Sequence, residues 1–395
     1  MIPAGKKVRI HSEMKKLIRL LGSAIRCFMM SVAASIAIGS FVSTKAGAKP
    51  RDTVIATISL NGSLFPESIV MNPKKREAYV SSRDGYIYGI DTATNTISFT
   101  YQSVNPFMSM DISPDGQTLY VVEIGAPPTV QESLVQFSIA KQQEIGSLPV
   151  GDAEIPAVSP DGSLVYLPDP SAGGGISGVR VFTTNPFSQT GTLGSYEDPI
   201  QAVFTPDGTH AYITFLGIQP TAGFLNYVDV ATGSWTRIKG AKFNRPFGIA
   251  MSPNGGTVYV TQSDSFNSAG AEQKGVVIVN TASNKISSWV SVVAPGANAP
   301  NYASLTGVPA ITPDGNYLYV PIPYTTYTDP ATGNTITYDA KTVAVINTET
   351  RKVIDQMTIE WDPQQVVIGP AGKRAYVLSV LYGVATVSVI DIAGG

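Results

Sequence analysis

The sequence has almost none of the side chains on which nucleophilic and metal-centred chemistry most often depends. Its single cysteine, Cys27, lies in the first 48 residues, and of its two histidines only His210 lies beyond them. The chain after residue 48 therefore has no disulfide, thiol nucleophile or thiolate metal site. His210 stands two residues before Tyr212, at a position where related segments of the chain carry unrelated residues. We expect it to be structural, which leaves no histidine for a Ser–His–Asp triad or a histidine-rich metal site.

The chain also lacks a helical pattern and a basic patch. After residue 49 no long stretch repeats its apolar residues with a period of about 3.6, so a helical solenoid is excluded. Lysine and arginine are spread singly or in pairs apart from Lys74–Arg76. Because nucleic-acid binding needs clustered cations that neutralise phosphates, we expect no nucleic-acid partner.

The first 48 residues differ from the rest. A basic stretch leads from Met14, the expected start, to an uncharged run at Phe28–Val42, and Ala46–Ala48 has the small-residue pattern of a cleavage site. The uncharged run is shorter than the roughly 20 residues of a spanning helix. We therefore expect residues 1–48 to be a signal peptide, the protein to be secreted or periplasmic in the cell envelope, and no stable membrane insertion after cleavage. The alternative is an uncleaved membrane anchor. Cleavage would remove 8 basic residues and 1 acidic residue and leave a net charge of −9.

A repeat dominates the remaining chain. Seven times a proline is followed six residues later by a tyrosine, and successive prolines are 41, 46, 46, 47, 60 and 57 residues apart. The pairs are Pro73/Tyr79, Pro114/Tyr120, Pro160/Tyr166, Pro206/Tyr212, Pro253/Tyr259, Pro313/Tyr319 and Pro370/Tyr376. A period of this size is typical of a β-propeller or a solenoid.

Each repeat predicts four antiparallel strands. A short apolar strand leads to a turn such as Ser113–Gly116 (SPDG), in which proline, aspartate and glycine suit successive turn positions. The tyrosine strand, a β-branched strand and a more alternating strand follow. Four strands per unit make one propeller blade. We therefore predict an all-β, seven-bladed β-propeller that spans residues 49–395 as a single domain.

The two ends of the array predict how the ring closes. Asp52–Leu60 matches a fourth strand, whereas the chain ends shortly after a third strand at Val387–Ile392. Pairing of these segments would complete the last blade and cover the edges that an open array exposes.

These repeats resemble the YVTN family of β-propeller repeats, which are WD40-like in architecture. The matching motifs are SPDGQTLYVV at 113–122, SPDGSLVYL at 159–167, IDTATNTI at 90–97 and DTVIATISL at 52–60. The resemblance covers the chain after the leader, with departures in the third strands of blades 3 and 4. It implies a fold similar to lactonase-type seven-bladed propellers and to repeats of microbial cell-surface proteins. Asp229–Trp235 (DVATGSW) also resembles the docking motif of quinoprotein propellers, but its short spacing favours a simple turn.

One face of the predicted propeller carries the longer connections. The turns within each hairpin on one side are short and nearly uniform, whereas the second-to-third connections on the other side are long. The long connections are 123–134, 168–177, 215–224, 262–275 and 321–341, the last of which holds Tyr324, Tyr327 and Tyr338. Insertions confined to one face of a repeat fold favour a binding face. The alternative is drift in surface loops without function.

Seven polar or aromatic residues in the inter-blade connections are the candidate ligand-binding residues. They are Glu67, Asn105, Glu154, Asp198, Arg245, Trp361 and Asp362. Carboxylates with one arginine at the mouth of the central channel could hold a divalent cation such as calcium, a polar ligand or a catalytic pair. The alternative is that these side chains cap strands in a solvated rim.

The function that the sequence favours is an exported propeller that binds a protein partner or a small polar ligand, such as a carbohydrate, without a cofactor or a catalytic activity of its own. The poverty of catalytic side chains supports this interpretation. The alternative is an enzyme of the lactonase or isomerase kind, with carboxylates and Arg245 at the channel mouth and a divalent cation bound there.

We predict that the exported protein begins at Lys49, because Ala46–Ala48 directly precedes it. The intact mass of protein recovered from the cell envelope or the medium checks this. A mature species that retains Phe28–Val42 would contradict cleavage and indicate an anchored protein.

Overall fold

The computed structural model describes residues 52–63, 65–125, 131–170, 178–194, 198–217, 223–238, 243, 245–262, 275–292, 302–328, 332, 335–381 and 383–393. The chain divides into two units, Met1–Lys49 and Pro50–Gly395. All described residues belong to the second unit, so the predicted signal peptide lies outside them. No helix long and apolar enough to cross a membrane occurs in these described ranges.

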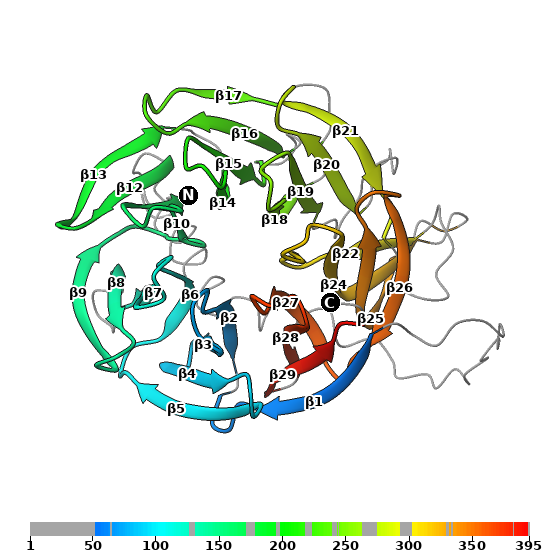
Figure 1. Ribbon diagram of the computed structural model, residues 1–395, viewed down its shortest axis with the longest axis horizontal. Coiled ribbons are helices and arrows are strands. Elements are labelled where there is room, and N and C mark those ends of the chain that lie inside the picture. Colours follow the sequence, from blue (N-terminus) through cyan, green and yellow to red (C-terminus); the bar gives the residue numbers. More distant parts are fainter. Residues whose placement is uncertain are drawn as a thin grey trace, which may run out of the picture. The chain divides into compact units, whose positions relative to one another are not determined.

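The described residues of the second unit form seven antiparallel sheets arranged in a ring (Figure 1). Blade 1 consists of β2 (Pro66–Met71), β3 (Glu77–Ser82), β4 (Tyr86–Asp91) and β5 (Thr96–Gln102). Blade 2 consists of β6 (Phe107–Ile112), β7 (Thr118–Ile124), β8 (Glu132–Ser138) and β9 (Gln143–Pro149). Blade 3 consists of β10 (Ala157–Val158), β11 (Leu164–Asp169), β12 (Gly178–Thr184) and β13 (Phe187–Gly194). Blades 4 and 5 consist of β14 (Pro199–Phe204), β15 (His210–Phe215), β16 (Phe224–Asp229) and β17 (Trp235–Arg237), and of β18 (Pro246–Met251), β19 (Thr257–Gln262), β20 (Val276–Asn280) and β21 (Lys285–Val290).

The last two blades depart from the simple order. Blade 6 consists of β24 (Tyr317–Thr328), β25 (Thr335–Asn347) and β26 (Lys352–Thr358), and both β22 (Tyr302–Leu305) and β23 (Ala310–Ile311) pair with β24. Blade 7 consists of β27 (Asp362–Ile368), β28 (Arg374–Leu381), β29 (Val384–Asp391) and β1 (Thr53–Ser59). Figure 1 shows β2, β6, β14, β18 and β27 nearest the centre of the ring, and β1, β5, β9, β13, β17, β21 and β26 around its circumference. The predicted seven-bladed propeller is confirmed.

The N-terminal strand closes the ring as predicted. β1 runs antiparallel to β29, with a register from Thr53 opposite Asp391 to Ser59 opposite Thr386. Ile58 and Leu60 bury their side chains in the core between blades 7 and 1. Blade 7 is therefore made from both ends of the described chain, and its third strand has no exposed edge.

The repeated turn has the geometry that its sequence demands. In Ser113–Gly116, the Gly116 N–H donates to the Ser113 carbonyl over 2.8 Å, and the Ser113 hydroxyl donates to Asp115. Gly116 has a φ of +69°, a left-handed conformation that favours glycine. Blade 1 has no glycine at this point, and there Asn72 accepts hydrogen bonds from the N–H groups of Lys74 and Lys75 instead.

The repeated tyrosine joins each blade to the next. All seven of these tyrosines are at most 4% exposed. The Tyr212 hydroxyl donates to Asn284 of blade 5 over 2.5 Å, and the Tyr376 hydroxyl donates to the Thr92 carbonyl of blade 1 over 3.2 Å. A tyrosine suits this place because its ring fills the apolar core between blades while its hydroxyl reaches the turn at the rim.

Blade 6 corrects the prediction of a long loop at 321–341. β24 and β25 have 12 and 13 residues, and they pair from Tyr317 opposite Asn347 out to Thr328 opposite Thr335. β22 adds a third strand along β24. The alternation of threonine, tyrosine and isoleucine in this segment satisfies β-strand preferences, so the insertion lengthens the sheet instead of forming a loop. Most of the other long connections lie outside the described residues.

Asp52 ties the two ends of the chain to blade 6. Its buried carboxylate accepts the Tyr319 hydroxyl over 2.6 Å and the Ala393 N–H over 2.9 Å. We predict that Asp52→Ala lowers the free energy of unfolding by about 1.5–3 kcal/mol, because it removes a charged acceptor from the buried Tyr319 hydroxyl and from the Ala393 N–H. Urea unfolding at neutral pH checks this.

The Tyr319→Phe variant is the matched control, since it removes only one donor. It should lower the free energy of unfolding by less than Asp52→Ala does. The double variant should lower it by less than the sum of the two single effects. Fully additive losses, or a wild-type free energy of unfolding in Asp52→Ala, would contradict the role of Asp52.

Candidate functional site

Trp361 and Asp362 lie where β27 begins, against the long hairpin of blade 6. The name blade-6 arm is used below for β22 together with the part of the β24–β25 hairpin that extends outward from Tyr324. At its base the register skips between Ile322 and Tyr324, because Ile322 lies opposite Thr342 but Tyr324 lies opposite Asp339. β24 and β25 both pack against β27. The irregular base of the arm therefore lies beside the start of blade 7.

The bulge at this base positions a cation. Lys341 has a φ of +46°, and its Nζ atom lies 5.3 Å from the centre of the Trp361 ring. This distance is within the range of a cation–π contact. Tyr324 and Asp339 are opposite one another and so share a face of the arm, whereas Tyr338 projects from the other face.

Asp362 is the most unusual group in this cluster. It is fully buried, and neither carboxylate oxygen has a hydrogen-bond partner of good geometry. Burial raises the pKa of this carboxyl to about 7, and the charge of Asp339 raises it too. The Tyr324 hydroxyl and the Lys341 ammonium act in the opposite direction. A carboxyl in this condition can bind a proton or hydrogen-bond donors at neutral pH.

Glu67 belongs to a second group, in blade 1. Its Oε1 atom lies 2.6 Å from Nε of Arg83. Burial raises the pKa of Glu67 to about 7 against the opposing effect of Arg83, and Asp84 raises it slightly. Asp84 in turn accepts hydrogen bonds from the Phe65 N–H and from the Ser82 hydroxyl. These contacts within blade 1 account for the Glu67–Arg83 pair and Asp84 without a ligand.

Three of the other candidates make backbone hydrogen bonds. The Glu154 carbonyl accepts the Ser109 hydroxyl of blade 2, the Asp198 carbonyl accepts the Leu216 N–H, and the Asn105 N–H donates to the Ser103 hydroxyl. Arg245 is half-buried with a φ of +52° just before β18. Of the seven residues, Trp361 and Asp362 thus share the arm cluster, whereas the charges that act on Glu67 come from its own blade.

Tyr324, Asp339 and Lys341 complete the arm cluster, and the sequence indicates them only in part. Tyr324 stood out as an aromatic residue of the longest insertion, but Asp339 and Lys341 did not. Their approach to Asp362 depends on the register skip in β24–β25, which alternation of side chains alone does not predict.

His210 has the structural role that its position in a hairpin predicts. It begins β15, stacks on Tyr227 with ring centres 4.7 Å apart and contacts the Thr209 hydroxyl.

The described residues contain no group of three or more histidine, cysteine, aspartate or glutamate side chains that could hold a metal ion. Asp362 and Asp339 form only a pair. A divalent cation at the arm cluster would therefore need further ligands, such as backbone carbonyls or water.

Comparison with known proteins confirms the architecture. No family model matches the chain, and no curated protein matches it in sequence. Among solved structures, a chain of hydrazine synthase from Kuenenia stuttgartiensis is similar with a TM-score of 0.66 and 17% sequence identity. The match covers 90% of this chain and 100% of that one. At this identity the likeness shows the propeller fold alone. Membership of the YVTN family stays a prediction.

We predict that Asp362 makes the protein less stable as pH rises. Its pKa is raised from 3.8 to about 7 in the folded state, so between about pH 4 and pH 7 the folded protein keeps a proton that the unfolded chain has lost. The free energy of unfolding therefore falls with rising pH in this window, by at most about 1.4 kcal/mol per pH unit from this group. Asp362→Asn should remove that dependence, as urea unfolding at several pH values would show.

Glu67→Gln is the control, because Glu67 has a raised pKa in a separate group. This variant should lose the pH dependence of the free energy of unfolding that Glu67 contributes and keep the dependence that Asp362 contributes. A pH dependence that is identical in wild type and Asp362→Asn would show that the buried carboxyl does not titrate as described.

Proposed function

We propose that this protein is an exported binding module that recognises a small polar ligand, of the carbohydrate class, at the base of the blade-6 arm. The observation that carries the proposal is Asp362, a fully buried carboxyl group whose two oxygens make no hydrogen bond of good geometry, beside a strongly elongated hairpin of the propeller. Buried polar groups are normally hydrogen-bonded, so this carboxylate would gain from donors that a ligand brings.

The neighbours of Asp362 support the same class of ligand. Asp339 supplies a second acceptor, Tyr324 and Lys341 supply donors, and Trp361 supplies an aromatic surface. A few convergent polar groups beside an aromatic ring are typical of sites that bind small polar molecules. Hydroxyl and ammonium groups of a sugar or an amino sugar would match the two carboxylates, and a calcium ion could join the ligand there.

The arm itself distinguishes blade 6 from the rest of the ring. Its two long strands reach 12 and 13 residues, whereas the strands of the other described blades have at most 8. Binding residues are often placed on such additions to a rigid scaffold. The arm therefore supports a binding role on this face of the propeller, for a small ligand or for the surface of a protein that carries it.

We predict that ligand binding depends on Trp361 and Asp362. A thermal-shift screen of neutral sugars, amino sugars, lactones and calcium chloride would find the ligand, which at 100 times its Kd stabilises the protein by about 2.7 kcal/mol. Isothermal titration with that compound should then show binding at least about tenfold weaker for Asp362→Asn and Trp361→Ala, which corresponds to about 1.4 kcal/mol.

Lys141→Ala is the control, since Lys141 is exposed in the turn between β8 and β9. It should bind like wild type. The proposal fails if no compound of the screen stabilises the protein, or if both arm-cluster variants bind as tightly as wild type.

The raised pKa of Asp362 favours one other function, a general base in a lactonase-type reaction. A carboxyl with a pKa of about 7 next to a tyrosine hydroxyl is suited to proton transfer at neutral pH. The lactones of the screen separate the two functions. Hydrolysis that rises with pH through about 7 and disappears in Asp362→Asn would replace the binding role by catalysis.

A further inference from the structure

The outer strands of the propeller share a β-bulge at one equivalent position. In each case the outer strand has one extra residue between two successive pairs with the third strand. The extra residues are Ser98 in β5, Ile145 in β9, Thr190 in β13, Ser287 in β21, Ile354 in β26 and Ile55 in β1. A bulge bends and twists an edge strand, and it hinders the addition of another strand there. Six blades of the ring therefore have a protected rim.

Blade 4 is the exception. Its outer strand β17 pairs in regular register, with Trp235 opposite Val228, Thr236 opposite Tyr227 and Arg237 opposite Asn226. The extra residue is missing, and β17 has only three residues. All three are exposed. Among the described outer strands, β17 is thus the one without the bulge.

The hydrogen bonds of β17 show which backbone groups face outward. The Ile238 N–H donates to the Leu225 carbonyl over 2.9 Å, and the Asp229 N–H donates to the Ser234 carbonyl over 2.8 Å. Hydrogen-bonded and non-hydrogen-bonded pairs alternate along an antiparallel ladder. Trp235 therefore belongs to a non-hydrogen-bonded pair, and its N–H and carbonyl point away from β16. An added strand could pair with these groups.

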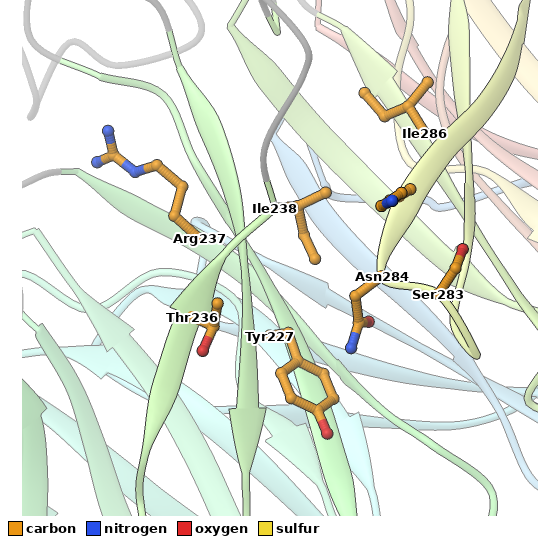
Figure 2. A pocket seen from close by; sticks show the side chains of 8 residues that line it. Tyr227, Thr236, Arg237, Ile238, Ser283, Asn284 and Ile286 are labelled. Atoms are coloured by element: carbon orange, nitrogen blue, oxygen red, sulfur yellow. The ribbon is translucent and has the colours of Figure 1, made fainter.

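A groove of about 510 Å³ runs beside this edge, between blades 4 and 5. Figure 2 shows Thr236, Arg237 and Ile238 of β17 on one side and the turn with Ser283, Asn284 and Ile286 on the other. Tyr227 and Lys285 complete its lining. This volume is within the range of about 300–1,000 Å³ found for ligand sites. Alternate side chains of an added strand could enter the groove.

The charges around the groove indicate what kind of strand would bind. Lys285 is the cation that faces the groove and no carboxylate lines it, whereas the guanidinium of Arg237 lies 3.5 Å from the centre of the Phe224 ring, outside the lining. In the outer halves of the two blades, residues 224–238 and 276–290, the one acidic residue is Asp229, which already accepts hydrogen bonds from the N–H and hydroxyl of Thr232. This local positive charge contrasts with a chain whose net charge is −2. An acidic segment would be attracted here.

We propose that the outer edge of blade 4 is a docking site for an extended, acidic peptide segment of a partner protein, which adds a fifth strand to the blade. The backbone of the segment pairs with β17, its apolar side chains enter the groove against Tyr227, Ile238 and Ile286, and its carboxylates face Lys285. Such strand addition takes affinity from main-chain hydrogen bonds and specificity from alternate side chains. The site is on the rim and is separate from the arm cluster.

The test uses fluorescence anisotropy with labelled peptides of alternating valine and glutamate, and of alternating valine and lysine. We expect the glutamate peptide to bind the mature wild-type protein and the lysine peptide to bind at least about tenfold more weakly. Trp235→Pro removes the outward N–H, and proline is tolerated at the first residue of an edge strand. It should abolish binding, whereas Trp235→Val, which keeps the N–H, should retain it within about threefold.

Two further variants separate charge from backbone pairing. Lys285→Glu should weaken binding of the glutamate peptide by at least about tenfold and strengthen binding of the lysine peptide. Insertion of a serine between Trp235 and Thr236 restores the bulge of the other blades and should abolish binding with the fold intact, as circular dichroism melts of every variant would confirm.

Several outcomes would overturn the proposal. They are the absence of glutamate-peptide binding to wild type, equal binding of both peptides, and equal binding by Trp235→Pro and Trp235→Val. Sedimentation that shows a wild-type dimer abolished by Trp235→Pro would assign the edge to a second copy of the chain and would also overturn it. None of these results depends on whether the arm cluster binds a sugar.

Discussion

The packing of a buried tyrosine of one blade against the next blade is the contact on which the rest of the ring depends. The ring of each tyrosine fills the apolar core between blades, and its hydroxyl requires a partner because burial without one costs free energy. Tyr212 finds Asn284, and Tyr376 finds the Thr92 carbonyl. Tyr319 finds Asp52, which stands just before β1 where the other blades have a continuous turn. Closure of the ring thus follows the same rule as the junctions made by Tyr212 and Tyr376, whereas the Tyr79 hydroxyl donates to Glu77 of its own blade.

This constraint acts on one face and leaves the other free to differ. The turns beside the tyrosine strand must keep a fixed shape, as the hydrogen bonds and left-handed glycine of Ser113–Gly116 show. On the other face β24 and β25 continue as a paired extension that β22 joins, so blade 6 extends its sheet into an arm. The arm then brings Asp339 and Lys341 to Asp362 at the start of the next blade. A buried carboxyl group without a hydrogen bond of good geometry is unfavourable for folding, and such unfavourable groups are expected where a protein binds something.

The rim is subject to a different constraint, the danger of edge-to-edge association. A closed propeller still has one outer strand per blade, and six of these strands have a bulge at the same point. Blade 4 has neither the bulge nor a long strand, because β17 follows a turn of the usual length but has no extra residue between Trp235 and Thr236. The segment that resembled a quinone-docking motif is a turn, closed by the hydrogen bonds from the Asp229 N–H to Ser234 and from the Gly233 N–H to Asp229.

The sequence by itself determined the fold class, the number of blades and the manner of closure, because each depends on local signals that repeat: a proline–aspartate–glycine turn, a tyrosine six residues after the proline, and a spare strand at the N-terminus. It also placed Trp361 and Asp362 at the start of an inner strand. Only the tertiary structure decided that residues 321–341 continue two strands, that a register skip brings Asp339 and Lys341 to Asp362, and that Glu67 pairs with Arg83. Strand register and inter-blade contacts depend on residues far apart in the chain. The alternation of side chains within one strand therefore does not predict them.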